Sequence, residues 1–524
     1  MTDDRGAASP AMIEDLLRAT AWPHPAEDVR LVETHISWVF LAGEFAYKLK
    51  KPVDLGFLDF RDPGRRLFYC REELRLNRRL APELYLEVVG ARPGPDGWRM
   101  GPWAEGAEPA VKMRRFPDEA QLDRQLDAGR LDARDMDVFA AELARFHDGA
   151  PRARPWHGYG TPDAVARPAL ENFEHLDSAI AGEAAGARIP RLLEWTRERA
   201  RGLAPAFASR LAVGYVREGH GDLHLANLVR IGERVAAFDG IEFDPALRWI
   251  DVQSDAGFLL MDLESRGRPD LGWRFFNAWL ERLGGQEGLN LLPWYLVYRH
   301  LVRAKVDAIR LAQGEPDDAT ADRLRARIER HVALAARRAE PEPPLAVILS
   351  GYSGSGKSHL AERLAPHLGA IRLRSDVERK RLHGLDPWTP GTAPPGEGLY
   401  TREATERTYD RLAGLARTAL AAGLPVVLDA AFLCHPRRLE FRRLAEAAGA
   451  RPVVLRCEAD PAVLRQRVAQ RTGDPSDAGI EVLEDQMARN PEPGPGEDPW
   501  IVRVRTDTPV DEAALARRLE ARGS

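Results

Sequence analysis

The residues best suited to phosphate chemistry lie near residue 350. An apolar run of strand length, LAVILS, leads into the glycine-rich segment GYSGSGKS, and leucines at helical spacing follow. Glycines let successive backbone N–H groups surround phosphate oxygens, a lysine reaches the terminal phosphates, and a serine hydroxyl can ligate Mg²⁺. We therefore predict a phosphate-binding site with Mg²⁺ formed by Gly351, Ser353, Gly354, Ser355, Gly356, Lys357 and Ser358, with Ser358 also a metal ligand.

Charged side chains downstream predict the rest of this site. A short strand runs into Asp376, which we expect to accept the proton of a substrate hydroxyl. A second strand ends at Asp429, which resembles a Walker B position, and the resemblance implies that this carboxylate supports the magnesium ion. Arg467 and Arg471 lie four residues apart on one helical face, which suits a lid over phosphates. The structural alternatives are a helix-capping Asp376, a turn carboxylate at Asp429 and a solvated basic face.

A second group of candidate residues lies in and after the segment HGDLHLAN. This segment places Asp222 two residues after a histidine and five residues before Asn227. Two short strands with a Gly-Glu turn follow, and folding this hairpin brings Asn227 and Asp239 to the same end. One amide oxygen and one carboxylate can then hold a divalent ion, while Asp222 is left to accept a proton. A polar hairpin with capping aspartates is the alternative.

This pattern resembles the catalytic loop of kinase-like phosphotransferases of the aminoglycoside and choline phosphotransferase type, HxDxxxxN followed by a metal-binding aspartate. The resemblance implies that Asp222 is the catalytic base or orients the substrate hydroxyl, and that Asn227 and Asp239 bind Mg²⁺. It also implies a lysine on an early strand that contacts the nucleotide phosphates. Residues 40–51 are typical of strand, turn and strand, with Lys48 as the first choice and Lys50 as the second.

The next helical segment, CREELRLNRRL, offers a carboxylate to pair with that lysine. Glu73 is our choice and Glu72 the alternative, and either could instead be a surface residue. Residues 111–117 resemble the strand and hinge that meet the adenine ring in such kinases. A glycine-rich GxGxxG loop is missing, as is common in members of the aminoglycoside type, and in the comparable loop we expect Ser37 to contact a phosphate.

The segment GYSGSGKS resembles the Walker A loop of P-loop nucleotidases. The alternation of strands and helices from about residue 345 to 510 is similar to small-molecule kinases of that class, which are grouped with AAA-family ATPases. Gluconate kinase, zeta-toxin-like kinases and polynucleotide 5′-kinases are examples. The whole chain thus resembles a bacterial fusion of two kinases.

A charged, proline-rich segment, RRAEPEPP, predicts a domain boundary near residue 340, because proline lacks the N–H group that helices and inner strands need. We predict an aminoglycoside phosphotransferase-like domain at residues 1–340, with lobes at about 1–116 and 117–340, and a P-loop kinase-like domain at residues 341–524. The expected folds are an α+β bilobal protein-kinase-like fold and an α/β P-loop NTPase fold with a mainly parallel sheet.

The composition excludes several classes of protein. With 44% hydrophobic and 30% charged residues, the chain is neither fibrous nor wholly disordered. The formal net charge of −5 favours a small-molecule partner over nucleic acid or a membrane. No run approaches the roughly 18 apolar residues of a membrane span, and the first residues lack a signal-peptide pattern, so we expect a cytoplasmic protein. Three scattered cysteines, Cys70, Cys434 and Cys457, predict reduced and mostly buried thiols.

Together these patterns predict an ATP- and Mg²⁺-dependent phosphotransferase with a small-molecule alcohol as acceptor and two nucleotide sites. One alternative is a regulatory protein that binds ATP in one or both domains without transferring phosphate. Another is a polynucleotide 5′-kinase-like activity of the C-terminal domain, which requires a continuous basic groove leading to Asp376. The sequence indicates neither the acceptor alcohol nor the oligomeric state.

Overall fold

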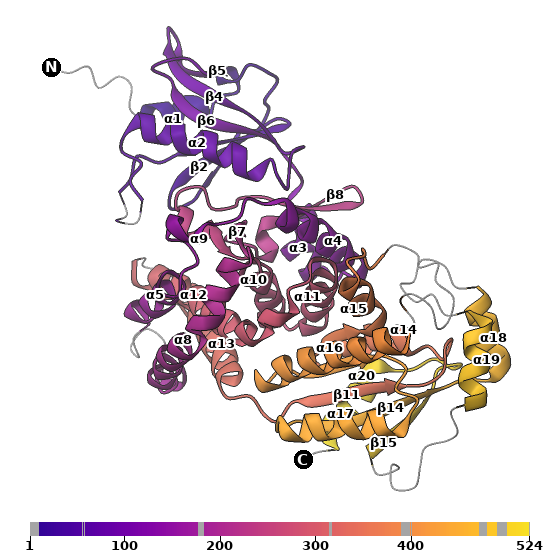
Figure 1. Cartoon of the computed structure of the whole chain (residues 1–524). Coiled ribbons are helices and arrows are strands. Elements are labelled where there is room, and N and C mark those ends of the chain that lie inside the picture. Colours follow the sequence, from indigo (N-terminus) through magenta and orange to yellow (C-terminus); the bar gives the residue numbers. More distant parts are fainter. Residues whose placement is uncertain are drawn as a thin grey trace. The chain divides into compact units, whose positions relative to one another are not determined.

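The computed structural model of the chain describes residues 10–54, 56, 58–176, 183–313, 317–388, 399, 401–470, 479–489 and 500–522. Packing contacts divide the chain into two compact units (Figure 1). The first comprises residues 1–164 and 211–259, and the second comprises residues 165–210 and 260–524. This grouping follows packing alone, so the domain boundary near residue 340 stays a prediction.

The first unit contains a six-stranded antiparallel sheet of order β1-β2-β3-β6-β4-β5. Alternate side chains of its strands point to opposite faces and fill two separate hydrophobic cores. Helix α1 packs against β5, while helix α2 packs against β4 and β6. The bounds are α1 (Pro10–Leu16), β1 (Arg30–Glu33), β2 (Ser37–Ala42), β3 (Phe45–Lys50), α2 (Pro63–Asn77), β4 (Tyr85–Gly94), β5 (Gly97–Pro102) and β6 (Glu108–Arg114).

Helix α2 begins after an N-cap aspartate, Asp62. The side chain of Asp62 accepts a hydrogen bond of 2.8 Å from the backbone N–H of Arg65, and proline occupies the first helical position. An N-cap carboxylate and an N1 proline both satisfy the unpaired end of a helix. The helix therefore presents Cys70 and Glu73 to the face of the sheet that it covers, where both are fully buried.

The rest of the first unit carries the second group of candidate residues. The predicted hairpin is confirmed, since β8 pairs with β9 antiparallel, and β7 forms a second pair with β10. The elements are η2 (Asp118–Ala120), α3 (Leu122–Asp127), α4 (Ala133–Gly149), η3 (Pro155–His157), β7 (Val216–Glu218), η5 (Leu225–Asn227), β8 (Leu228–Ile231), β9 (Arg234–Ala237), α9 (Pro245–Arg248) and β10 (Trp249–Asp251).

The second unit combines a group of helices with a five-stranded sheet. Helices α12 and α13 pack against each other through Val297, Leu301, Ile328 and Val332. The helices that precede the sheet, of which α5, α8 and α10 each extend across a boundary between the two units, are α5 (Pro162–Glu171), η4 (Asn172–His175), α7 (Glu183–Gly186), α8 (Ile189–Ala212), α10 (Val252–Ser265), α11 (Pro269–Leu283), η6 (Gln286–Leu291), α12 (Leu292–Gln313) and α13 (Asp318–Ala339).

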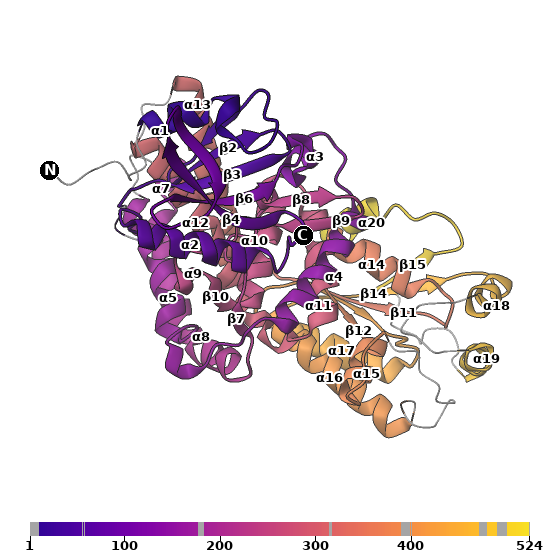
Figure 2. The same cartoon turned by 90° about the horizontal axis from the view of Figure 1, so that it is seen from above.

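The sheet has the order β12-β13-β11-β14-β15, and every pair of neighbouring strands is parallel. Figure 2 shows α14 and α20 on one face and α16 and α17 on the other. This layering confirms the predicted α/β fold with a parallel sheet. The bounds are β11 (Leu345–Ser350), α14 (Lys357–His367), β12 (Ile371–Arg374), α15 (Ser375–Leu382), α16 (Arg402–Ala421), β13 (Val426–Asp429), α17 (His435–Ala447), β14 (Arg451–Glu458), α18 (Pro461–Ala469), α19 (Ile480–Arg489), β15 (Ile501–Arg505) and α20 (Glu512–Ala521).

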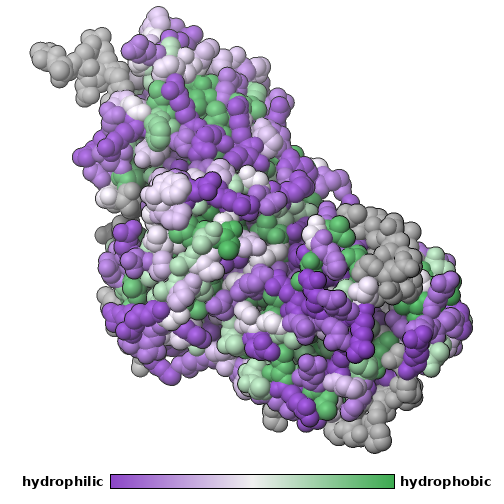
Figure 3. All heavy atoms as spheres, viewed as in Figure 1, coloured by the Kyte–Doolittle hydropathy of each residue, from purple (hydrophilic) through white to green (hydrophobic). Residues whose placement is uncertain are grey.

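Two further expectations concern the surface and the thiols. Within the described ranges, no helix is both long and apolar enough to cross a membrane. On the face seen in Figure 3, hydrophilic residues are interspersed with smaller hydrophobic patches. All three cysteines are free; Cys70 and Cys457 are buried and Cys434 is half-buried, as the sequence predicts.

Candidate nucleotide and phosphotransfer sites

Strand β3 places two lysines on the face that α2 covers, because side chains two residues apart on a strand point the same way. Lys48 Nζ lies 2.9 Å from Glu73 Oε1 and also pairs with Asp239. Lys50 Nζ lies 2.8 Å from Glu73 Oε2 and pairs with Glu242. Glu73 thus bridges both lysines, and Lys48 is the one that also reaches the predicted metal-binding carboxylate.

Charge pairing outweighs burial at Lys48 and Glu73, but not at Glu242. Burial lowers the pKa of Lys48, but Asp239, Glu73 and Glu242 together raise it well above its ordinary value. Burial raises the pKa of Glu73, but the two lysines outweigh burial and lower it to about 2. The pKa of Glu242 is raised, mainly by burial, although Lys50 opposes this. Lys48 and Glu73 are therefore both charged at neutral pH.

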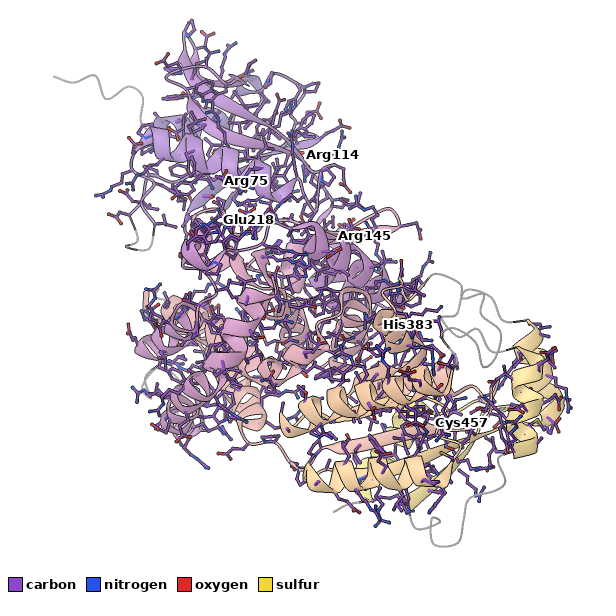
Figure 4. All side chains as sticks on the ribbon, in the orientation of Figure 1. Arg75, Arg114, Arg145, Glu218, His383 and Cys457 are labelled. Atoms are coloured by element: carbon purple, nitrogen blue, oxygen red, sulfur yellow. The ribbon has the colours of Figure 1, made fainter. Side chains whose placement is uncertain are left out.

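The alternative helix carboxylate has other partners. Glu72 pairs at 2.8 Å with Arg75, which also lies 2.8 Å from Glu218 of β7. Figure 4 labels both Arg75 and Glu218, which lie side by side. Arg248 also contacts Glu218, at 3.2 Å. The structure therefore brings Glu73, and not Glu72, to the lysines of β3.

The predicted phosphate contact of Ser37 is wrong in this fold. Ser37 is the cross-strand neighbour of Lys50, and its side chain is fully buried. Its hydroxyl therefore does not face a ligand in solvent. Cross-strand neighbours point to the same face, so Ser37 lies on the face of Lys50, and it is the burial of this position that the loop sequence did not indicate.

The residues of the HGDLHLAN segment converge with the hairpin as the sequence predicts. Asn227 Nδ2 donates to the backbone oxygen of Asp222 at 3.0 Å and to Asp222 Oδ2 at 3.2 Å. His224 Nε2 lies 3.3 Å from the same carboxylate oxygen. The backbone N–H of Phe238 donates to the backbone oxygen of Asn227 at 3.0 Å, which joins the two ends of the hairpin. Asn227 and Asp239 are therefore held at the same end of the hairpin.

The turn at Asp239 has a left-handed backbone, with φ of 62°. Aspartate tolerates this region better than most residues, but the conformation still needs support from its surroundings. The backbone N–H of Asp239 donates to Tyr85 Oη at 3.0 Å, and that of Gly240 donates to Asn77 Oδ1 at 2.7 Å. The sequence does not indicate Tyr85 or Asn77, because they lie in distant elements and no spacing pattern links them to the turn.

Asp255 fixes the other side of the catalytic loop. Its carboxylate accepts hydrogen bonds from the backbone N–H groups of His220 at 2.8 Å and Gly221 at 3.0 Å. His147 Nε2 lies 3.1 Å from the same carboxylate. Burial raises the pKa of Asp255, but the hydrogen bond and charges of these neighbours outweigh it and keep the pKa below its ordinary value. Asp255 therefore positions the loop that carries Asp222.

The glycine-rich loop connects β11 to α14 in the second unit. Gly354 and Gly356 adopt φ values of 79° and 75°, which favour glycine, and a Cβ atom at Gly354 would lie 2.6 Å from the backbone oxygen of Leu464. Lys357 begins α14, and its Nζ donates to the backbone oxygen of Tyr352 at 2.8 Å. The loop thus leads into a helix N-terminus that favours an anion.

Asp429 stands beside this loop with an oxygen that fits a metal ion. Ser358 Oγ donates to Asp429 Oδ1 at 3.0 Å. Asp429 Oδ2 is buried and accepts no hydrogen bond from the residues that the structure describes. The nearby cation is Arg374, whose Nε lies 3.4 Å from that oxygen. A serine hydroxyl and a carboxylate oxygen without a donor are ligands of the kind that Mg²⁺ prefers, so these residues fit the predicted metal.

Most of the predicted residues of the second unit share one cavity of about 360 Å³, which Gly351 and Ser355 do not line. Tyr409 and Gln486, which the sequence did not indicate, also line it. Ser353 donates its backbone N–H to Gln486 at 2.8 Å, and Thr506 Oγ1 donates to the backbone oxygen of Ser355 at 2.7 Å. Gly351 donates its backbone N–H to Ala431 at 3.2 Å. The predicted residues lining the cavity are Ser353, Gly354, Gly356, Lys357, Ser358, Asp376, Asp429 and Arg467.

A second cavity, of about 540 Å³, adjoins the first at Gly356 and Arg467. Its other walls include Thr506, Pro509 and Val510. Arg467 Nη2 donates to the backbone oxygen of Thr506 at 2.7 Å, so the guanidinium lies between the two cavities. Arg471 lies outside the described residues.

The chain therefore has an N-terminal region built on a six-stranded antiparallel sheet and a C-terminal P-loop domain with a parallel five-stranded sheet. Solved structures of kinases are similar to each part. A gluconokinase from Sinorhizobium meliloti is 23% identical, covers 34% of this chain and 98% of its own, and has a TM-score of 0.25. The amicoumacin kinase hAmiN, in complex with AMP-PNP, is 15% identical, covers 62% of this chain and 93% of its own, and has a TM-score of 0.39.

The family model described as AAA domain matches residues 347–493. Two curated mycobacterial proteins match over almost the whole chain: the uncharacterized proteins Rv2004c of Mycobacterium tuberculosis and Mb2027c of Mycobacterium bovis. Each is 34% identical over 494 residues, which cover 93% of this chain and 94% of the relative. The chain belongs to the family that these two mycobacterial proteins represent.

Proposed function

We propose that the protein is an ATP- and Mg²⁺-dependent phosphotransferase that acts on hydroxyl groups of small molecules, with one nucleotide site in each region. The observation that carries this proposal is the meeting of Lys357, Ser358, Asp376 and Asp429 around one cavity. A phosphate-binding lysine, two metal-competent oxygens and a carboxylate base are the groups that phosphoryl transfer requires. The N-terminal region assembles the same kinds of groups in Lys48, Asn227, Asp239 and Asp222.

In the P-loop site the backbone N–H groups of the glycine loop and Lys357 hold the phosphates. Asp376 accepts the proton of the acceptor hydroxyl while the hydroxyl oxygen forms a bond to the γ-phosphorus. The bond between the γ-phosphorus and the oxygen that bridges it to the β-phosphate breaks, which releases ADP. Ser358 and Asp429 hold Mg²⁺, which when bound neutralises charge on the phosphates. Arg379 and Arg467 line the same cavity and add positive charge around the transferred group.

In the N-terminal site Lys48 holds the phosphates and Glu73 keeps the lysine extended toward them. Asn227 and Asp239 are the residues that hold the metal there. Asp222 accepts the hydroxyl proton, and its neighbours Asn227 and His224 fix the carboxylate in place. Both regions therefore perform one reaction type with different scaffolds.

The cavity dimensions favour a small acceptor. A volume of about 360 Å³ lies in the range of small-molecule sites. The adjoining cavity, with Pro509 and Val510 in its wall, suits a nucleotide base beside the phosphates. A polynucleotide 5′-kinase would instead require a basic groove that continues away from Asp376. The cavity is lined by acidic side chains and a tyrosine (Asp376, Asp429 and Tyr409) as well as by arginines, which favours a small-molecule acceptor over a polynucleotide.

The test is a metabolite screen with γ-labelled ATP on the full chain. We compare the wild type with Asp222→Asn, Lys357→Ala and the double variant. Each single variant should lose the products of one region, and the double variant should lose all labelled products. If the double variant forms every product at the wild-type rate, the site assignments are wrong. Bound ATP without any labelled product across the screen would favour the regulatory alternative.

A further inference from the structure

Helix α11 covers the free edge of the P-loop sheet. Strand β12 is the edge strand, so one side of its backbone has no strand partner. Asn277 of α11 fills this role with its side-chain amide. Its Nδ2 donates to the backbone oxygen of Ala370 at 2.8 Å, and its Oδ1 accepts from the backbone N–H of Arg372 at 2.8 Å. These two hydrogen bonds therefore fix the position of β12 relative to α11.

One turn further along α11, Glu281 meets two arginines of the same strand. Glu281 Oε1 accepts from Arg374 Nη1 at 2.9 Å, and Glu281 Oε2 accepts from Arg372 Nη2. The side chains of all three residues are less than one tenth exposed. Burial raises the pKa of Glu281, but Arg372 and Arg374 outweigh burial and hold the pKa below its ordinary value. Glu281 is therefore a buried anion at neutral pH.

Arg374 is shared between Glu281 and the nucleotide site. Arg374 and Asp429 are direct neighbours on the paired strands β12 and β13. The guanidinium turns its Nη1 to Glu281, and its Nε stays 3.4 Å from Asp429 Oδ2, beyond the usual length of a charged hydrogen bond. Asp429 in turn accepts from Ser358, the first hydroxyl of the P-loop helix. A continuous chain of contacts thus runs from α11 to the glycine loop.

We propose that Glu281 is a positioning residue for the P-loop site: it draws the Arg374 guanidinium away from Asp429 and so keeps one oxygen of that carboxylate available for Mg²⁺. Helix α11 lies outside the segment that the AAA domain model matches, so the metal affinity of the P-loop domain depends on a preceding helix. The inference rests on the proposed function only in taking Asp429 and Ser358 as the residues that hold the metal.

The charges determine the direction of the effect. Without the Glu281 charge, Arg374 loses the partner that holds its Nη1 and turns toward Asp429, whose Oδ2 already lies 3.4 Å from its Nε. The arginine then competes with Mg²⁺ for the same oxygen. Arg374 exchanges its contact with Glu281 for one with Asp429. From this exchange of one charge contact we expect a rise of about fivefold in the Mg²⁺ concentration that gives half-maximal nucleotide binding. Nucleotide affinity in EDTA should stay unchanged, because Lys357 and the loop amides are untouched.

The experiment measures binding of a fluorescent ATP analogue to the full chain during a titration with MgCl₂. The signal that Lys357→Ala removes is assigned to the P-loop site. Glu281→Gln should shift the Mg²⁺ midpoint about fivefold upward. Glu287→Gln is the matched control, because it removes the ion pair with Arg411 from the same unit and contacts neither Arg374 nor Asp429. Its midpoint should equal that of the wild type.

The double variant Glu281→Gln/Arg374→Gln separates positioning from damage to the fold. Removing the competing cation should return the midpoint to the wild-type value or below it, whereas a loosened strand β12 would leave it raised. An unchanged or lowered midpoint in Glu281→Gln overturns the inference, as does a midpoint that stays raised in the double variant. Failure of the wild type to bind the analogue at Lys357 would instead overturn the proposed function.

Discussion

The two proposed nucleotide sites use a lysine in contrasting ways. Lys357 belongs to the loop that it serves, and its Nζ donates to a backbone oxygen five residues earlier. Lys48 meets Glu73 of α2 and Asp239 of the hairpin turn, so three separate segments must fold together before its site exists. The comparison shows that a local motif can build a phosphate site largely from backbone geometry, whereas an assembled site depends on buried charge pairs. Changes in the N-terminal site should therefore affect folding as well as binding.

The largest expected effect concerns the N-terminal base. Replacing Asp222 by Asn keeps the shape and removes the proton acceptor, so we expect transfer by this region to fall about 1,000-fold. Nucleotide affinity should stay the same, because Lys48, Asn227 and Asp239 remain. Initial rates in a Lys357→Ala background isolate this region from the P-loop site. An unchanged rate would remove Asp222 from the mechanism and leave its contacts with Asn227 a structural role.

The second prediction tests the dependence of the assembled site on buried charge. Glu73→Gln leaves Lys48 and Lys50 without their shared carboxylate, which should lower the local free energy of unfolding by about 3 kcal/mol. Hydrogen exchange of the peptides that contain β3 measures this change. Glu72→Gln is the control, because Glu72 forms a partly exposed pair with Arg75, and such pairs contribute up to about 1 kcal/mol. Equal effects of the two variants would contradict the bridging role of Glu73.

The same carboxyl group predicts a pH dependence. Its pKa is lowered from an ordinary value of 4.5 to about 2 in the folded protein. The stability it contributes is therefore fully present above pH 4.5 and is lost as the pH falls toward 2. The difference in stability between wild type and Glu73→Gln should be constant near neutral pH and shrink in acid. A difference that grows in acid would show that another group carries the effect.

The parts of the two sites that could be predicted from the sequence are those whose residues lie close together in the chain. Residues 351–358 are contiguous, and their spacing alone predicts a strand, an anion-binding loop and a helix. The hairpin that joins Asn227 to Asp239 is also local, and its alternation predicts the pairing that the structure shows. Strand periodicity predicts that Lys48 and Lys50 share a face, but not that one glutamate bridges both.

The residues that could not be predicted reach the sites from distant elements. Tyr85 of β4 supports the Asp239 turn without a local pattern that links the two, and Glu242 pairs with Lys50 although they lie 192 positions apart in the chain. Tyr409 enters the P-loop cavity from α16 in the same way. Such contacts depend on strand order and on helix packing angles, which the hydrophobic pattern of one segment does not contain. Ser37 shows the same limit, since the packing that buries it beside Lys50 comes from other elements.

The fourth prediction concerns the local site. Lys357→Ala removes one charged contact with the terminal phosphates, so affinity for an ATP analogue at the P-loop should fall about 30-fold. Stability should change little, because the Nζ of Lys357 contacts a backbone oxygen, whereas Lys48→Ala should also lower the protection of β3 against exchange. Binding titrations and hydrogen exchange on both variants test the comparison. A similar loss of protection in both would mean that the two sites depend equally on charge pairing.

The smallest expected effect distinguishes the two cavities of the P-loop domain. Arg467 lies between them, and its guanidinium donates to the backbone oxygen of Thr506. If it contacts the phosphates, Arg467→Ala weakens ATP and inorganic triphosphate equally, by about fivefold for one partly exposed charged contact. If it instead packs on the base in the second cavity, ATP loses affinity and triphosphate does not. We expect the first result, because Arg467 also lies within 3.4 Å of the backbone oxygen of Gly354, in the phosphate loop. Competition titrations with both ligands decide between them, and a loss confined to ATP would place this arginine at the base.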